Sequence, residues 1–166
     1  MTVLLEIFLV EAYFTNHFVN VVNFKHIRTM ATIEQITSAL EKLGYNLEPN
    51  AKKSGVSFNY MLERAFCHYD SKYKTVTLLL PNFYRTNCEL EDTIREVNSH
   101  DHIGRIAKLN YNCFTIVTSF RVVAEEHILE QLTFALNDMR LLYEDFFNVR
   151  REHIEERQQI PYGNED

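Results

Sequence analysis

Three consecutive polar residues, His100-Asp101-His102, are the group in this sequence with the clearest capacity to hold a metal ion. Two imidazoles and a carboxylate supply nitrogen and oxygen ligands of the kind that zinc accepts. Zinc needs three or four ligands, so the fold would have to bring up a further side chain such as His68, Cys67 or Cys113. We favour a polar loop that holds no metal, and a small metal-dependent enzyme using these three residues is the alternative.

A second pair of residues with chemical capacity is Cys67 beside His68, a thiol next to a base. Adjacent residues of a strand point to opposite faces of a sheet, so these two side chains should not meet. The sequence contains none of the motifs GxGxxG, GxxxxGK[ST] and GxSxG, and its 4 glycines are few for a phosphate-binding loop. We therefore predict no catalytic residue, no cofactor and no enzyme.

The composition of the chain predicts where the protein is located and which classes of partner it does not bind. The formal charge of -6 opposes the basic surface that nucleic acid or an anionic membrane requires. The chain has no apolar run near the ~18 residues of a membrane-spanning helix. Its three cysteines, Cys67, Cys88 and Cys113, show no CxxC spacing and predict reduced thiols. We expect a cytoplasmic protein that binds neither nucleic acid nor membranes.

Aromatic residues are the feature that most suggests binding. The chain contains 12 Phe and 9 Tyr, more than one small core usually buries. Aromatic side chains are enriched in protein interfaces, where charged ones are depleted. We select six candidate partner-binding residues that could line a groove: Phe83, Tyr84, Tyr111, Phe120, Tyr143 and Phe147.

The element around which the rest of the chain is organised is a long helix predicted over 125–147, which carries Tyr143 and Phe147. Its apolar residues recur at alternating spacings of four and three, which places them on one stripe that should be buried: Ile128, Leu132, Ala135, Met139, Leu142 and Phe146. Leu129, Leu136 and Tyr143 widen this stripe. The other side should face water and includes Glu126, Glu130, Asn137, Asp138, Arg140 and Glu144.

The remaining elements are shorter. Thr32 and Gln35 have the form of a capping box, and the helix that follows should end near Gly44. Alternating apolar residues predict strands over 56–60, 65–69 and 75–80, the last stopped by Pro81. A helix over 89–98 and two strands, 104–109 and 113–120, joined by an Asn-rich turn, precede the long helix.

The resulting order is α-βββ-α-ββ-α. It has too little chain between its strands for the helical crossovers of a doubly wound parallel sheet. We therefore predict an α+β fold with a five-stranded antiparallel sheet and the long C-terminal helix packed on it.

The chain divides into an N-terminal extension (1–29), a folded domain (30–148) and a charged C-terminal tail (149–166). The extension has an apolar stretch over 3–10, but its first basic residue is Lys25, which opposes a secretory signal peptide. One hypothesis makes Met30 the natural start, with the extension loosely held. The alternative is an added strand or helix that covers an exposed apolar surface.

Two passages carry a resemblance to a known family: Thr77 to Tyr84, a strand running into Pro81, and Ile94 to Asn98, which ends the middle helix. With the strand pair and closing helix that follow, the region from about 33 to 148 resembles the YbjN-type family of bacterial sensory transduction regulators. The fold of that family is similar to type III secretion chaperones. Two departures are Ser99-His100-Asp101, where the family usually has an Asn-Arg-like pair, and the N-terminal extension.

The resemblance implies a protein that binds another protein, often as a dimer, and it offers no catalytic residues to carry over. We therefore expect a non-enzymatic bacterial binding or regulatory module. It would hold a partner polypeptide or dimerise through an apolar surface of its sheet or long helix. A regulator that binds a small ligand between sheet and helix is a further alternative.

The hypothesis that residues 1–29 are loosely held predicts that their removal leaves the protein's stability unchanged. A chain beginning at Met30 should melt within a few degrees of the full chain, because the core would lose no contacts. Thermal unfolding followed by circular dichroism measures this. A larger fall in melting temperature would instead support the covering strand or helix.

Overall fold

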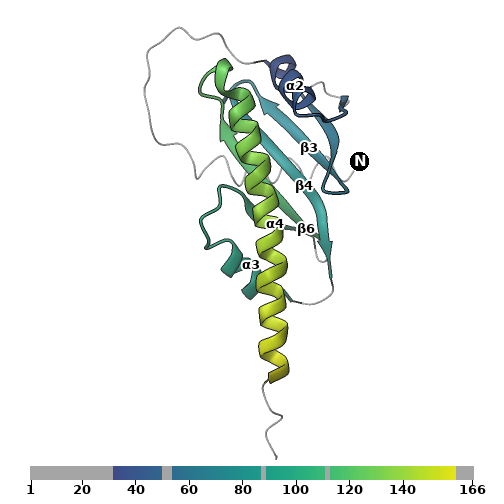
Figure 1. The fold of residues 1–166 in the computed structure, drawn as a ribbon, viewed down its shortest axis with the longest axis vertical. Helices are drawn as coiled ribbons and strands as arrows, with labels where there is room; N and C mark the ends of the chain where they lie inside the picture. Colours follow the sequence, from purple (N-terminus) through teal and green to yellow (C-terminus); the bar gives the residue numbers. More distant parts are fainter. Residues whose placement is uncertain (1–31, 50–53, 87–88, 111–112, 160–166) are drawn as a thin grey trace, which may run out of the picture.

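The computed structural model describes residues 32–49, 54–86, 89–110 and 113–159 (Figure 1). The extension 1–29 and Tyr111 therefore lie outside the described residues. The described elements, in chain order, are α2 (Ile33–Lys42), β1 (Glu48–Pro49), β2 (Gly55–Tyr60), β3 (Glu63–Asp70), β4 (Thr75–Arg85), α3 (Glu91–Val97), β5 (Arg105–Asn110), β6 (Cys113–Arg121), a 3-10 turn (Glu125–His127) and α4 (Ile128–Gln159).

The strands form one antiparallel sheet in the order β1-β2-β3-β4-β6-β5. This confirms the α+β class, the antiparallel sheet and the long C-terminal helix. The prediction of five strands in the order α-βββ-α-ββ-α was wrong, because β1 adds a sixth by pairing Glu48 with Ser57 and Pro49 with Val56. Proline indicates a loop, but it is tolerated in an edge strand, where its missing N–H breaks no ladder.

Strand β4 also differs from the prediction, because it continues past Pro81 to Arg85. The pairing with β6 shifts register between Leu80 and Tyr84, and Asn82 has a φ of 57°. Such a bulge accommodates a proline within a sheet, since the irregular residues need no ladder hydrogen bond. The consequence is that Phe83 and Tyr84 stay on the sheet.

The first predicted helix boundary is confirmed. The Thr32 hydroxyl accepts a hydrogen bond from the Gln35 amide at 3.4 Å, and the Gln35 side chain accepts one from the Thr32 amide at 2.8 Å. This reciprocal pair is the capping box, and it satisfies two amides that the helix itself leaves unpaired. Helix α2 then buries Ile36 and Leu40 completely.

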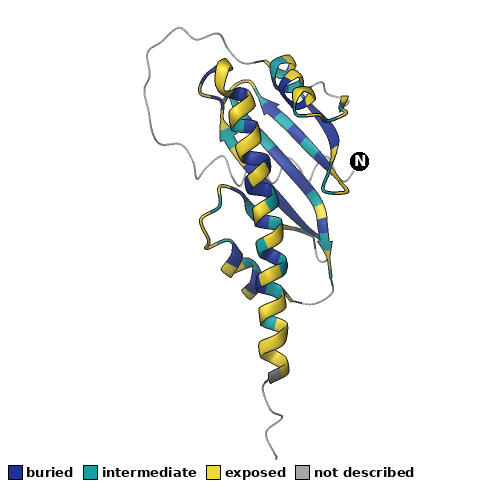
Figure 2. Ribbon diagram, in the orientation of Figure 1, coloured by how far each residue is buried: buried dark blue, intermediate teal, exposed yellow. Residues whose placement is uncertain are grey.

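The core lies between the sheet and the helices. Leu132, Met139 and Phe146 of α4 have no exposed surface, and the buried side of α4 faces the sheet (Figure 2). They share one buried cluster with Leu78 and Ile116 of the central strands. The amphipathic stripe predicted for the long helix is therefore confirmed as its core-facing side.

The face of the sheet that points away from this cluster is apolar at its centre. Leu79 of β4 pairs with Phe66 of β3 on one side and with Val117 of β6 on the other. Leu79 and Val117 are only 7% and 4% exposed, yet neither belongs to the main core cluster. Leu79 and Val117 therefore form a buried apolar pair on the face of the sheet opposite the main core.

The central position of Leu132 leads to a stability prediction. Leu132→Ala should lower the free energy of unfolding by about 2–5 kcal/mol, because it removes buried methyl groups and leaves a cavity. The neighbouring Thr133→Ala is the control, since Thr133 is exposed and should change stability by less than about 1 kcal/mol. Urea unfolding compares the two. Equal effects would contradict the assignment of Leu132 to the core.

Candidate functional site

Five aromatic rings pack together where the end of β4 meets the middle of α4. Phe83 and Tyr84 come from the strand, and Tyr143, Phe146 and Phe147 come from one side of the helix. Ring centroids lie 4.8 Å apart for Tyr143 and Phe147, and 5.7 Å apart for Tyr84 and Phe147. These separations are within the range in which aromatic pairs attract one another. The cluster therefore fixes the end of β4 against α4.

Burial divides this cluster into two parts. Phe83 and Phe146 are buried, with ring centroids 5.2 Å apart, so they contribute to the core. Tyr84, Tyr143 and Phe147 are half-buried and reach the surface. The guanidinium carbon of Arg150 lies 4.9 Å from the centroid of the Tyr84 ring, a cation–π contact at the edge of this surface.

A second group of rings continues the aromatic surface toward α2. Tyr45 and Tyr60 are half-buried, with ring centroids 6.1 Å apart. The Tyr60 hydroxyl donates a 2.6 Å hydrogen bond to the carbonyl oxygen of Leu136 on α4. Burial, with a smaller contribution from Tyr45, raises the pKa of Tyr60 to about 12. Leu136 precedes Tyr143 by two helical turns, so both groups lie along the same side of α4.

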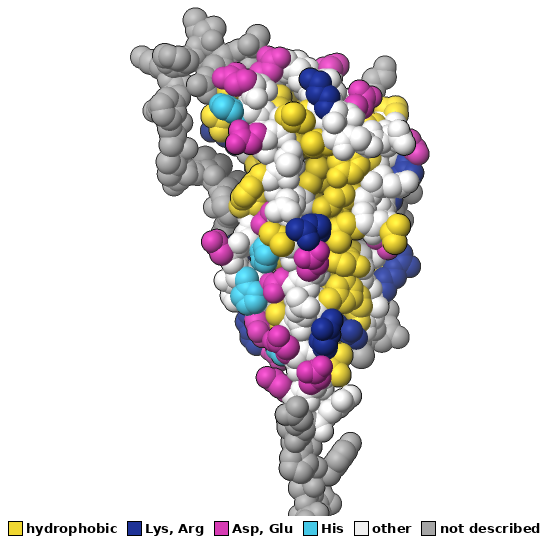
Figure 3. All heavy atoms as spheres, in the orientation of Figure 1, with side chains coloured by type: hydrophobic (Ala, Val, Ile, Leu, Met, Phe, Trp, Pro, Cys, Tyr) yellow, Lys and Arg dark blue, Asp and Glu magenta, His cyan; other side chains and the backbone are white. Residues whose placement is uncertain are grey.

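We call Tyr45, Tyr60, Tyr84, Tyr143 and Phe147 the aromatic strip. Figure 3 shows hydrophobic side chains gathered in a band beside α4. The band lies on the side of the helix where Figure 1 shows the strands of the sheet. Charged side chains border this band (Figure 3). The arrangement is an apolar surface with a polar rim, which is typical of a protein interface.

The six predicted partner-binding residues do not all meet. Tyr84, Tyr143 and Phe147 belong to the strip, whereas Phe83 is buried beneath it. Phe120 pairs with Val76 near the start of β4, at the opposite end of that strand from Tyr84. The sequence-based selection missed Tyr45 and Tyr60. The sequence did contain a signal for these two residues. Leu136 and Tyr143 widen the apolar stripe of α4 on one side, so apolar side chains from other elements must pack against that side.

The loop between α3 and β5 holds His100 and His102 in a defined conformation. The Asn98 side chain donates to the Ile106 carbonyl at 2.9 Å and accepts from the Ile106 amide at 2.8 Å, which closes the loop at its base. Gly104 is buried, and a Cβ there would lie 2.4 Å from Thr118 Oγ1. Only glycine permits the loop to approach β6 this closely.

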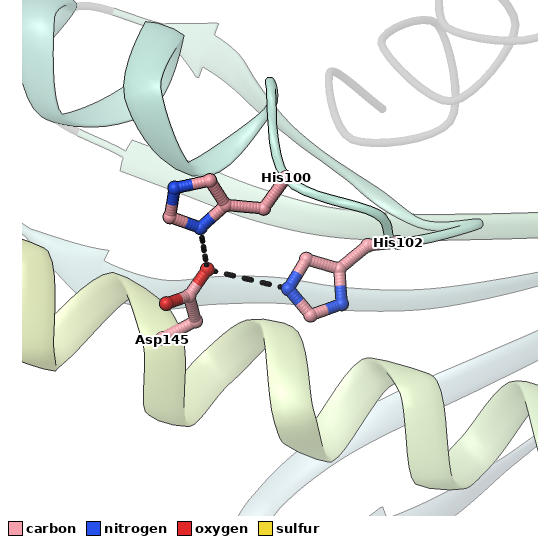
Figure 4. A group of neighbouring side chains, drawn as sticks. All are labelled: His100, His102 and Asp145. Carbon is pink, nitrogen blue, oxygen red and sulfur yellow. Dashed lines mark hydrogen bonds and ion pairs between the residues drawn. The ribbon is translucent and has the colours of Figure 1, made fainter.

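Both histidines point toward Asp145 of α4 (Figure 4). Asp145 Oδ2 lies 2.6 Å from His100 Nδ1 and 3.3 Å from His102 Nε2. The two imidazoles thus lie beside one carboxylate, which belongs to Asp145 and not to Asp101, because Asp101 is exposed. Asp145 is 45 residues from His100, so only the packing of the loop on α4 brings them together.

Asp138 corrects another prediction, since it was assigned to the water-facing side of the long helix and is only 7% exposed. Its carboxylate accepts hydrogen bonds from the Gly104 amide at 2.8 Å and the Ile103 amide at 3.2 Å. Asp138 Oδ1 also lies 3.4 Å from His102 Nδ1. These three partners compensate for burying the charge.

The structure places Cys67 on β3 among the core side chains, with an exposure of 1%. Burial raises the pKa of its thiol to about 12. Its neighbour His68 pairs with Thr77 on the next strand and points to the other face of the sheet. The arrangement does not form a thiol nucleophile with its base.

A shallow groove of about 380 Å³ lies between α2 and the edge of the sheet formed by β1 and β2. Ile33, Leu47 and Val56 give it an apolar lining, and Glu34 and Glu41 add two carboxylates. It is the region in which the predicted small-ligand regulator would bind its ligand.

No protein-family model matches this chain, and no curated protein matches it either. Within the described residues, no helix combines the length and the apolar character that crossing a membrane requires. The fold and site define an α+β protein with an aromatic strip on one side of α4 and a cluster of two histidines and two aspartates at the α3–β5 loop.

The raised pKa of Cys67 leads to a prediction of chemical reactivity. The Cys67 thiol is buried and its pKa is raised, so at pH 8 it should stay protonated and should not react with Ellman's reagent in the folded protein. The folded parent and Cys67→Ser should release the same amount of chromophore. After unfolding in guanidinium, the parent should release one more equivalent. An extra equivalent from the folded parent would revive a reactive thiol.

Proposed function

We propose that this protein is a non-enzymatic binding module whose aromatic strip is covered by polypeptide, either a partner chain or a second copy of itself. The observation that carries the proposal is the arrangement of five partly buried aromatic rings along one side of α4: Tyr45, Tyr60, Tyr84, Tyr143 and Phe147. Rings of this kind bury large apolar areas at a low cost in side-chain entropy.

Further apolar residues lengthen the same side of α4. Leu129 and Ile154 are 41% and 40% exposed. Together with Leu136, Tyr143 and Phe147 they follow spacings of seven and four, which recur on one side of a helix. Exposed apolar residues that continue one surface favour a binding interface over isolated surface residues.

The charged residues beside the strip also support a protein partner. Arg140 forms an ion pair with Glu144 on α4, and Arg150 covers the Tyr84 ring. The resemblance to secretion chaperones supports the same class of function. A bacterial origin and a cytoplasmic location remain expectations from the sequence.

Self-association tests the proposal first. If a second copy covers the strip, the full chain should form a dimer in a light-scattering concentration series, and Phe147→Ser should dissociate it at concentrations where the parent is dimeric. Phe134→Ser is the matched control, because Phe134 is also exposed on α4, at 60%, but lies on the opposite side. Its dimerisation should equal that of the parent.

Site-specific photo-crosslinking distinguishes the two occupants. With p-benzoylphenylalanine at position 147 in cells, a product of twice the chain mass indicates a second copy, and another defined mass indicates a partner polypeptide. Position 134 should give neither. A monomer at every concentration, together with no crosslinked product at position 147, would contradict the proposed function.

A further inference from the structure

We propose that His100, His102 and Asp145 bind a divalent transition-metal ion of the zinc class. The metal-binding atoms of the three side chains lie within 4.8 Å of one another. In a tetrahedral zinc site, ligand atoms about 2.0–2.2 Å from the metal are roughly 3.4 Å apart. Small side-chain adjustments therefore convert the present arrangement into a coordination shell. This inference is independent of the proposed function, because it concerns the other side of α4.

The surroundings of His102 are the strongest argument. Its Nδ1 lies 3.4 Å from Asp138 Oδ1, and its Nε2 lies 3.3 Å from Asp145 Oδ2. Of these two contacts only the one between Nε2 and Asp145 has hydrogen-bond geometry, and a neutral imidazole carries a single N–H that one carboxylate can accept. The two carboxylates place negative charge on both sides of the ring, which favours a metal ion between His102 and Asp145.

Asp138 lies where it can support a metal ion bound by His102. Its carboxylate is held by the amides of Ile103 and Gly104, so it stays in place 3.4 Å from His102 Nδ1. With a metal bound, His102 would ligate it through Nε2, which faces Asp145, and its Nδ1–H would point toward Asp138. A histidine that ligates a metal through one nitrogen and donates the other N–H to a carboxylate is the usual arrangement in metal sites.

Charge and access agree with this assignment. Asp138 and Asp145 form their described ion pairs with His100 and His102, so two carboxylates share two imidazoles. Arg105, the nearby cation, donates instead to the backbone carbonyls of His102 and Gly104. The side chains of His100 and Asp145 are 41% and 25% exposed, so an ion can enter from solvent. Three protein ligands leave a fourth position for water.

Another histidine on α4 provides a contrast and a control. His153 Nε2 lies 2.8 Å from Glu96 Oε2, while its Nδ1 lies 2.9 Å from the Thr93 hydroxyl. A hydroxyl can donate or accept, so a neutral His153 satisfies both partners without any cation. His153→Gln should therefore leave metal binding unchanged.

The experiment titrates ZnCl₂ into the full chain after removal of metal with EDTA and dialysis, using isothermal titration calorimetry. The expected result is one zinc per chain and a raised melting temperature. His102→Gln and Asp145→Asn should each weaken binding at least tenfold, and Asp138→Asn should weaken it about 10–100-fold through the orientation of His102. The visible spectrum of a Co²⁺ complex should show four-coordinate geometry in the parent and lose it in Asp145→Asn.

Circular dichroism verifies that each variant folds. If a variant at a more buried residue, such as His102→Gln, does not fold, His100→Gln is measured in its place. The exposed His100 side chain can be changed without disturbing the core. Absence of stoichiometric zinc in the parent would overturn the proposal. So would equal affinity in the parent and His100→Gln, or the same loss of affinity in His153→Gln as in His102→Gln.

Discussion

The packing of α4 across the sheet is the interaction on which the other features depend. Leu132, Met139 and Phe146 are fully buried along about four turns of the helix and share one core cluster with the central strands β4 and β6. A helix of this length would be only marginally stable alone, so its apolar stripe and the sheet stabilise one another. Because the stripe fixes the rotation of α4 about its axis, it also determines which residues face each side.

The two sides of α4 have different physical characters. On one side, Tyr143 and Phe147 complete an aromatic strip with rings from the strands and from the chain after α2, and its exposed apolar area favours burial by polypeptide. On the other side, Asp138 and Asp145 meet the α3–β5 loop. There a buried carboxylate is compensated by backbone amides and an imidazole, so that side is held by polar contacts that depend on direction. One side of α4 thus offers apolar contacts, which depend little on direction, and the other side forms polar contacts, which depend strongly on it.

Local rules predicted much of the fold and little of the site. The capping box of Thr32 and Gln35, the α4 stripe and the alternating strands were predictable, because each depends on residues within a few positions of one another. The continuation of β4 through Pro81 and the edge strand at Pro49 were not. In both cases the pairing with the neighbouring strand decides whether a missing N–H matters, and this pairing cannot be read from the residues next to the proline. Asp138 appeared water-facing for the same reason, since its partners Ile103 and Gly104 lie on another element.

The sequence by itself determined the α+β class, the helix that organises the core, and the presence of two histidines in one loop, because periodicity and adjacency are local properties. Tertiary structure alone decided that Asp145, and not Asp101, completes the histidine cluster, and that Tyr84, Tyr143 and Phe147 share a surface from which Phe120 is excluded. The physical reason is that contacts between side chains on different elements depend on how each element is rotated and translated against the others. That placement follows from the packing of the whole core, which no single segment encodes.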